Sequence, residues 1–362
     1  MCGACHLYVL RMQSSDKWHL TPHKETGNMD QNPLHRKGGS VMRTRTKVWL
    51  ITAASLVLIG CIVFGGAMSM LKWDFTKLST AKYERNAHEI SENYKNISII
   101  TNTADIVFMP SESPTTSVSC YEQKGIKHSV AVKDGTLAIE VVDTRKWYEY
   151  IGFNFDTPKL TVYLPQGEYG NLSVNANTGD VEIPEAFKFK SIDISENTGN
   201  VESHASAIEG VKIKTTTGDI CVEDIAAGSL DLTVSTGKVT VSSVSCVGNI
   251  TVGVSTGKTY LSNIRCKSFT STGTTGDISS SHVIAAGKFS VKRSTGDVLF
   301  DCSDAAELYI EIDTGDVTGS LLTEKVFITK TDTGNVNVPK TVNGGRCEII
   351  TTTGDIKITI KQ

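Results

Sequence analysis

Thr, Asp and Asn side chains, whose oxygens can coordinate calcium, recur at a fixed spacing in the C-terminal half of this 362-residue chain. The tripeptide Thr-Gly-(Asp/Asn/Lys) occurs ten times, 19 or 20 residues apart. Its glycines are Gly179, Gly199, Gly218, Gly237, Gly257, Gly276, Gly296, Gly315, Gly334 and Gly354. A period of this length is typical of stacked repeats, which would bring the hydroxyls and carboxylates into rows. Such a row is a candidate cation site.

The residue after each glycine argues against calcium and ice binding. It is acidic or an amide in eight repeats, but Lys238 and Lys258 supply a cation where calcium needs a ligand. The nonapeptide calcium repeat also has about half this period. An ice-binding face needs Thr-x-Thr in successive repeats. Only three repeats have that step directly before the glycine, at Thr215/Thr217, Thr331/Thr333 and Thr351/Thr353.

We expect the tripeptide to enforce a corner instead. The glycine supplies a positive φ, which costs other residues about 1 kcal/mol or more. The preceding Thr forms a ladder along one edge, and the following residue forms an Asx-turn row with its charge partly balanced. Contact with a glycan or wall polymer is the open alternative, although no aromatic ladder marks its place.

The nine cysteines have irregular spacing, which argues against a disulfide-built domain. Cys246 and Cys266 each follow their glycine by nine residues, so they should lie one repeat apart. Their backbones would be about 4.8 Å apart, which allows either a disulfide or, as we favour, an inward stack of two buried side chains. Residues 2–6, CGACH, spell a c-type haem attachment site. We interpret that match as a coincidence, because haem is attached outside the membrane and this segment is predicted inside.

No motif of a known enzyme is present. His204 and His282 are the only histidines of the repeats and are four repeats apart, which disfavours a His-based metal site or catalytic dyad. A polysaccharide-cleaving enzyme would have to rely on Lys238 and Lys258 with the nearby Asp219 and Asp277. We therefore expect a protein without catalytic residues, cofactor or metal.

The elements that position the repeat residues are short strands. In residues 218–234, GDICVEDIAAGSLDLTV, two alternating segments rich in β-formers flank a turn of small residues. No 3.6-residue period is sustained. The sequence therefore predicts an all-β fold, a parallel β-solenoid of about ten turns over residues 171–362. At about 4.8 Å a turn, the rod would be about 50 Å long.

Residues 48–71 form an uncharged apolar run of 24 residues, long enough to cross a membrane. Residues 1–47 carry eight Lys and Arg against three acids, +5, which leaves −8 for the rest of a chain with net charge −3. The positive-inside rule predicts a cytoplasmic N-terminus and extracellular repeats, and we expect the N-terminal segment to be disordered.

Residues 58–61, LIGC, resemble a lipobox, but the apolar run continues beyond Cys61. An alternative start at Met42 would make residues 1–41 an upstream overrun. The acidic remainder disfavours nucleic acid as a partner.

Between membrane and repeats we expect a linker (72–87) and a β-rich cap (88–170). Residues 102–106 read as a degenerate repeat with Ala104 in place of glycine, and residues 133–136, KDGT, as a hairpin turn. The aromatic cluster Trp147, Tyr148, Tyr150, Phe153 and Phe155 is expected to plug the end of the solenoid. The tenth repeat is followed by only eight residues, which predicts an open C-terminal strand edge for self-association, guarded by Lys357 and Lys361.

Three segments and the Thr-Gly-Asp-Val/Ile repeats together resemble one known family. The segments are NISIITNTADI (96–106), RKWYEYIGF (145–153) and PKLTVYLP (158–165). Over residues 88–362 the chain is similar to the bacterial "putative adhesin" β-strand-repeat family, a domain family of unknown function. The resemblance implies a right-handed β-solenoid on the cell envelope and no catalytic residues. It implies adhesion or wall contact as the function, with an accessory role in envelope-stress signalling as the alternative; a polysaccharide-active enzyme is the least favoured.

Overall fold

The computed structural model describes residues 44–74, 82–147 and 156–361 of the chain. It divides into two compact units, Met1–Ala67 and Met68–Gln362. Helix α1, Thr44–Met70, starts four residues before the expected apolar segment and ends one residue before its end. Among the described residues it is the one helix long and apolar enough to cross a membrane. Its large apolar side chains, such as Trp49, Val57 and Val63, are exposed.

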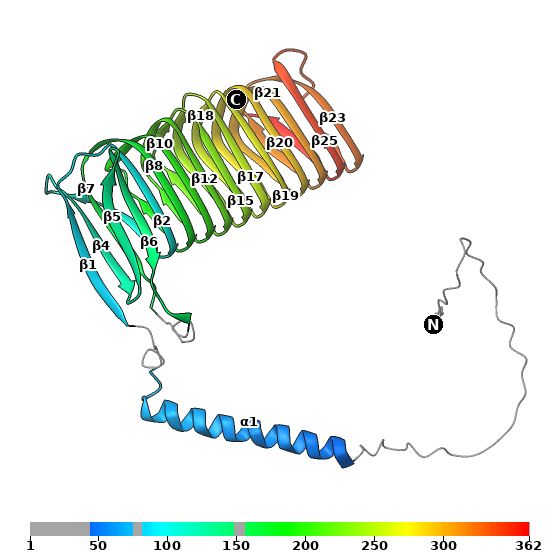
Figure 1. The fold of residues 1–362 in the computed structure, drawn as a ribbon. Coiled ribbons are helices and arrows are strands. Elements are labelled where there is room, and N and C mark those ends of the chain that lie inside the picture. The colour runs from blue at the N-terminus through cyan, green and yellow to red at the C-terminus, as the bar shows by residue number, and fades with distance from the viewer. Residues whose placement is uncertain (1–43, 75–81, 148–155, 362) are drawn as a thin grey trace, which may run out of the picture. The chain divides into compact units, whose positions relative to one another are not determined.

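The Thr-Gly repeats form a parallel β-solenoid, as predicted (Figure 1). In each turn, or rung, one strand leads into the Thr-Gly corner and another leads out of it. The strands that lead in are β2 (Asn96–Thr103), β8 (Gly167–Thr178), β10 (Phe187–Thr198), β12 (Ser206–Thr217), β15 (Leu230–Thr236), β17 (Asn249–Thr256), β19 (Ser268–Thr275), β23 (Lys325–Thr333) and β25 (Gly345–Thr353). Those that lead out are β3 (Asp105–Ser111), β9 (Val181–Ile183), β11 (Val201–Ser203), β13 (Ile220–Glu223), β14 (Ala226–Ala227), β16 (Val239–Cys246), β18 (Thr259–Cys266), β22 (Val317–Leu321), β24 (Val336–Asn337) and β26 (Ile356–Ile360). Two long strands, β20 (Ile278–Thr295) and β21 (Val298–Thr314), do both.

Alternation along each strand fills the space between the faces with one continuous apolar core. In β15, Leu230, Leu232 and Val234 are buried, whereas Asp231 and Thr233 between them are exposed. Parallel pairing in register places like side chains on top of one another, as in the pair Leu232 and Val252. The stacked rings of Phe269 and Phe289, with centroids 4.6 Å apart, show the same arrangement. Burial of this kind is the main stabilising term of the rod.

An N-terminal cap closes the first end of the core. Its strands are β1 (Tyr83–Ile90), β4 (Thr116–Gln123), β5 (Ile126–Lys133), β6 (Thr136–Asp143) and β7 (Lys159–Pro165). The degenerate repeat is confirmed as a rung, since β2 and β3 around Ala104 pair with β8 and β9. Strands β6 and β7 add one more rung in parallel, and β5, β4 and β1 then pair antiparallel. The predicted hairpin joins β5 to β6, and β1 begins at Tyr83, inside the expected linker.

The expected aromatic plug of the solenoid falls largely outside the described residues. Trp147 is described, and its side chain is exposed. Tyr148, Tyr150, Phe153 and Phe155, like residues 1–43 with their CGACH segment, are not among the residues that the structure describes.

The C-terminal rungs exchange places, which covers part of the strand edge expected to be open: β24 pairs with the C-terminal strand β26 only at Ile356 and Lys357. Strand β25 lies between β21 and β23, and β26 lies between β22 and β24. Strands β23 and β24 therefore form the outermost rung, and the last rung of the chain, β25 and β26, lies between them and β21 and β22. The inserted rung buries Cys347, Ile349, Ile356 and Ile358, whereas β23 buries only Lys325 and has mostly exposed side chains. The more apolar rung thus takes the covered position, and partly buried Phe327 packs over the core end.

A second corner recurs in five successive rungs. Asp224, Ser243, Asn263, His282 and Cys302 each follow a repeat glycine by six residues and have φ between 50 and 56. Asp, Asn and His tolerate this left-handed conformation better than β-branched residues do. This corner was not predicted, although Asp224, Ser243 and Asn263 at one fixed offset from the glycines were a usable signal.

Candidate functional site

The Thr-Gly corner places the repeat residues in parallel rows. All ten repeat glycines have φ between 130 and 153. A Cβ atom on any of them would lie 1.8–2.3 Å from a backbone carbonyl oxygen of a neighbouring rung. The preceding threonines stand in register, as in Thr178, Thr198 and Thr217, which confirms the predicted ladder. The corner therefore combines a left-handed backbone with a close approach between rungs.

The Asp and Asn side chains after the glycines are occupied by hydrogen bonds between rungs. The Asp180 Oδ1 atom accepts the N–H of Asn200 at 2.7 Å, and the Asn200 Oδ1 atom accepts that of Asp219 at 2.9 Å. The bond recurs further along, for example from the Asp355 N–H to Asp316 Oδ1 at 2.7 Å. The expected hydrogen-bond partners of this row are thus wrong: the side chains bond to the neighbouring rung instead of forming Asx turns within their own rung. Stacking in register brings the next rung's N–H within reach, so the oxygens hold rungs together rather than a cation.

The two lysines of this row form ion pairs with their neighbours. Lys238 Nζ lies 3.3 Å from Asp219, and Lys258 Nζ lies 3.0 Å from Asp277. The hydrogen bond from Lys258 holds the pKa of the Asp277 carboxyl below its usual value. A general acid needs the opposite shift. These four residues are therefore two exposed ion pairs rather than an acid and a base converging on a substrate.

Glu196 is an acidic residue inside the core. It occupies the inward position three residues before a repeat glycine and is 3% exposed. Neither carboxylate oxygen has a hydrogen-bond partner. Burial, helped by Asp180 and Asp105, raises its pKa from 4.5 to about 8. Because the folded state binds this proton more tightly than the unfolded state, the stabilisation is complete below pH 4.5 and is lost as pH rises through 8.

We expect Glu196→Gln to remove this pH dependence. The free energy of unfolding of the wild-type chain should fall between pH 5 and pH 8, by up to about 1.4 kcal/mol per pH unit from this group. Thermal unfolding of the full chain in detergent should show Glu196→Gln gaining on the wild type as pH rises. The exposed Glu182→Gln is the control and should track the wild type. Parallel profiles for all three chains would contradict the prediction.

Arg293 lies in the same interior column as Glu196, and both of its Nη atoms have hydrogen-bond partners, whereas its Nε is buried without one. Its Nη1 donates to Val254 O at 3.0 Å, and its Nη2 donates to Thr259 Oγ1 at 3.0 Å. Gly273, its neighbour in the preceding rung, provides the space for the guanidinium, because a Cβ at Gly273 would lie 2.4 Å from Arg293 Nη1. The guanidinium thus packs over a glycine, bonds to the Gly257 rung through both Nη atoms, and reaches the Gly276 rung through a bond from Nη2 to Ser271 Oγ at 3.3 Å.

Cys246 and Cys266 are free thiols in the structure. Both are buried, at 5% and 6% exposure, at the end of strands β16 and β18 of adjacent rungs. Burial raises the pKa of Cys266 to about 12, and the neighbouring Cys246 contributes to the shift. Such a thiol is unreactive at neutral pH.

The second corner gathers polar groups that the sequence analysis did not connect. Ser281 Oγ lies 2.9 Å from His282 Nδ1 and donates to Asp301 Oδ2 at 3.0 Å. Cys302 Sγ lies 2.8 Å from Lys361 Nζ. The serine stands between the imidazole and the carboxylate, so the carboxylate does not orient the imidazole as a catalytic triad requires. Stacking of rungs 20 residues apart brings Ser281 to Asp301, and the exchange of the last rungs brings Lys361 to Cys302, 59 residues away.

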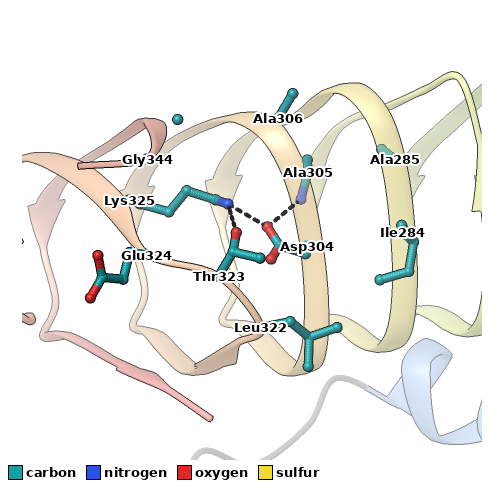
Figure 2. A pocket seen from close by; sticks show the side chains of 11 residues that line it. Ile284, Ala285, Asp304, Ala305, Ala306, Leu322, Thr323, Glu324, Lys325 and Gly344 are labelled. Carbon is teal, nitrogen blue, oxygen red and sulfur yellow. Dashed lines mark hydrogen bonds and ion pairs between the residues drawn. The ribbon is translucent and has the colours of Figure 1, made fainter. Parts of the chain in front are cut away.

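A pocket of about 720 Å³ lies where the exchanged rungs meet (Figure 2). It is lined by Ile284, Ala285, Asp304, Ala305, Ala306, Leu322, Thr323, Glu324, Lys325, Gly344 and Gly345. We call it the C-terminal pocket. The sequence does not reveal this pocket, because its walls include strands that only the exchange makes neighbours.

A buried ion pair forms one wall of the C-terminal pocket. Lys325 Nζ lies 2.6 Å from Asp304 Oδ1, and their side chains are 3% and 9% exposed. Lys325 also donates to the Thr323 hydroxyl, and the Ala305 N–H donates to Asp304 Oδ1 at 2.7 Å (Figure 2). Asp304 Oδ2 is buried without a hydrogen-bond partner. A mostly apolar pocket with a few convergent polar groups is the usual form of a binding site.

Comparison with known proteins identifies the family. The chain matches the Toastrack DUF4097 family over residues 94–253 and 247–362, and no curated protein matches it. A "putative lipid binding protein" and a "putative adhesin" from Parabacteroides distasonis, both of known structure, are 15% and 12% identical to it, with TM-scores of 0.43. The alignments cover 76% and 77% of this chain and 97% and 98% of theirs. A "putative adhesin" from Parabacteroides merdae is 14% identical over 78% of this chain and 98% of its own, with a TM-score of 0.36. The family match spans the solenoid and most of its cap, so the chain belongs to the Toastrack DUF4097 family.

Proposed function

We propose that the chain is a non-enzymatic, single-pass membrane protein of the cell envelope whose solenoid serves as an adhesin-like contact scaffold. The exposed apolar helix α1 supports the anchor. The basic residues Arg43, Arg45 and Lys47 at its N-terminal end support a cytoplasmic N-terminus and an extracellular solenoid.

The C-terminal pocket is the observation that carries the contact role. The chain enters the solenoid through the cap, so the pocket lies at the opposite end of the rod (Figure 1). Its small apolar walls, Ala305 and Ala306, suit the C–H face of a sugar ring, and the exposed Thr323 and Glu324 offer hydrogen bonds to hydroxyls. We therefore propose a saccharide unit of an envelope or wall polymer as its ligand.

Protease treatment of intact cells tests the anchor and its orientation. The full chain would carry one epitope tag before its N-terminus and another after Gln362. We expect the C-terminal tag to be lost and the N-terminal tag to stay protected until the cells are opened. Protection of the C-terminal tag in intact cells would overturn the proposed orientation.

Sedimentation of the purified full chain with insoluble wall polysaccharide tests the contact role. Ala306→Trp fills the pocket from an exposed position without touching the ion pair. We expect it to weaken binding about tenfold or more, the loss of about 1.4 kcal/mol. Thr251→Trp, at an exposed strand position outside the pocket, is the matched control and should bind as the wild type does. Equal binding by both variants would exclude the pocket, and no binding by the wild type would reject wall contact.

A further inference from the structure

Three side chains of metal-ligand type meet inside the N-terminal cap, at the other end of the rod. Cys120, Glu122 and His128 are buried, with exposures of 1%, 1% and 6%. One ligand atom of each, the thiol sulfur, a carboxylate oxygen and an imidazole nitrogen, lies within 4.8 Å of the other two. We call these three residues the cap cluster. Neither the repeat corners nor the C-terminal pocket explains why they are gathered in the core.

The fold of the cap buries these three side chains in its core. Cys120 and Glu122 alternate with half-exposed residues on β4, so both point to the inner face. His128 is on β5, which follows β4 after a two-residue turn. Strand β4 pairs with β7 and β5 pairs with β6, so the two strands belong to opposite faces of the cap. The cluster therefore links the two faces across the core.

We propose that Cys120, Glu122 and His128 bind a divalent cation of the zinc type. Thiolate, imidazole and carboxylate are the three side-chain ligands that zinc takes in proteins. A doubly charged cation would balance one thiolate and one carboxylate, and a buried site must be balanced in this way because uncompensated charge in a core is costly. The ligand set, with sulfur, nitrogen and oxygen, disfavours calcium and magnesium, which prefer oxygen alone.

The distances need only a small adjustment. Tetrahedral zinc with bonds of 2.0–2.3 Å holds its ligand atoms about 3.3–3.6 Å apart. His128 Nδ1 and Glu122 Oε2 lie 2.9 Å apart, so they must separate by about 0.5 Å to admit the ion. The sulfur lies within 4.8 Å of one ligand atom of each of these residues, so it must approach by about 1.2 Å at most. Rotation of side chains on fixed strands covers shifts of this size.

The hydrogen-bond partners around the cap cluster are of the kind that orient metal ligands. Thr101 Oγ1 lies 3.0 Å from His128 Nε2, which leaves Nδ1 directed at the cluster. Asn86 Nδ2 donates to Glu122 Oε1 at 2.7 Å and leaves Oε2 directed there. Such outer contacts fix the ligands in known metal sites. A pocket of about 180 Å³, lined in part by Glu122 and His128, adjoins the cluster and offers a path for the ion and room for a water as fourth ligand.

The competing explanation is a metal-free hydrogen-bonded pair. Glu122 Oε2 accepts the backbone N–H of His128 at 2.8 Å as well as contacting its ring. That pair satisfies glutamate and histidine, but it gives the thiol of Cys120 no role. The two explanations differ in one observable: only the metal site makes a bond to sulfur.

Cobalt binding to the full chain in detergent tests the proposal. The chain would carry Cys2→Ser and Cys5→Ser, which removes the thiols of the CGACH segment. We expect one equivalent of Co²⁺ to produce a sulfur-to-cobalt charge-transfer band, and Zn²⁺ to displace it. Cys120→Ala should abolish the band. Cys246→Ala removes a buried thiol elsewhere and should retain it.

Thr101→Val provides a second test that keeps all three ligands. It removes the hydroxyl that orients His128, so Co²⁺ affinity should fall about 10–100-fold while the band at saturation is unchanged. This variant decides the matter even if Cys120→Ala does not fold. The proposal is overturned if the starting chain shows no charge-transfer band with Co²⁺, if folded Cys120→Ala retains it, or if Thr101→Val binds as tightly as the starting chain.

Discussion

Substitution of Gly237 by Ala should destabilise the solenoid by about 4 kcal/mol or more. The residue has φ 153, and an alanine Cβ would lie 1.9 Å from the carbonyl oxygen of Gly218 in the preceding rung. The strained backbone alone costs about 1–3 kcal/mol in a residue other than glycine. The clash adds to it, because the obstructing atom is backbone held by pairing on both sides. Thermal unfolding of the full chain in detergent measures the loss.

Gly253→Ala is the matched control, one rung further along. This glycine has no positive φ, and the nearest atom to its added Cβ is 3.7 Å away, an ordinary contact. Its substitution should be neutral or stabilising by up to about 1 kcal/mol, because alanine restricts the unfolded chain more than glycine does. If both variants lose the same stability, the corner geometry is not the reason that glycine recurs.

Replacement of Lys325 by Met should cost about 3–5 kcal/mol, the usual effect of removing one partner of a buried ion pair. Its ammonium lies 2.6 Å from Asp304 Oδ1, and both side chains are at least nine-tenths buried. Without it, the carboxylate keeps only the Ala305 N–H as a donor, because its second oxygen already has no partner. The midpoint of denaturant unfolding of the full chain measures the change.

The double variant Asp304→Ala/Lys325→Met separates pairing from burial. Replacing both charges by apolar groups is often close to neutral, so the double variant should recover most of the stability that Lys325→Met loses. Lys330→Met removes an exposed lysine of the same strand and should change stability by less than about 0.5 kcal/mol. Additive losses in the double variant would show that the two side chains act independently.

The repeats were predictable because their constraints are local and periodic. Each Thr-Gly pair carries its own conformational requirement, and the alternation in Leu230, Leu232 and Val234 states which side chains point inward. Ala104 was recognised as a degenerate corner for the same reason. The apolar helix was visible in composition alone.

Contacts between distant segments were not predictable in this way. The Asp and Asn residues after the glycines were expected to form Asx turns, because the sequence lists only their neighbours along the chain. It does not reveal which N–H group of the next rung lies beside each side chain. Ser281 and Asp301 meet only because rungs 20 residues apart lie in register, whereas Asp304 and Lys325 meet where the last rungs exchange places.

What the sequence by itself determined is the architecture: an apolar helix, a solenoid of Thr-Gly rungs, and glycine at corners with positive φ. Each of these follows from properties of single rungs. The tertiary structure alone decided the order of the last rungs, the C-terminal pocket that this order creates, and the meeting of Cys120, Glu122 and His128 across the cap. The physical reason is that a rung's place depends on how much apolar surface it buries against its neighbours, a comparison between distant segments that no local pattern contains.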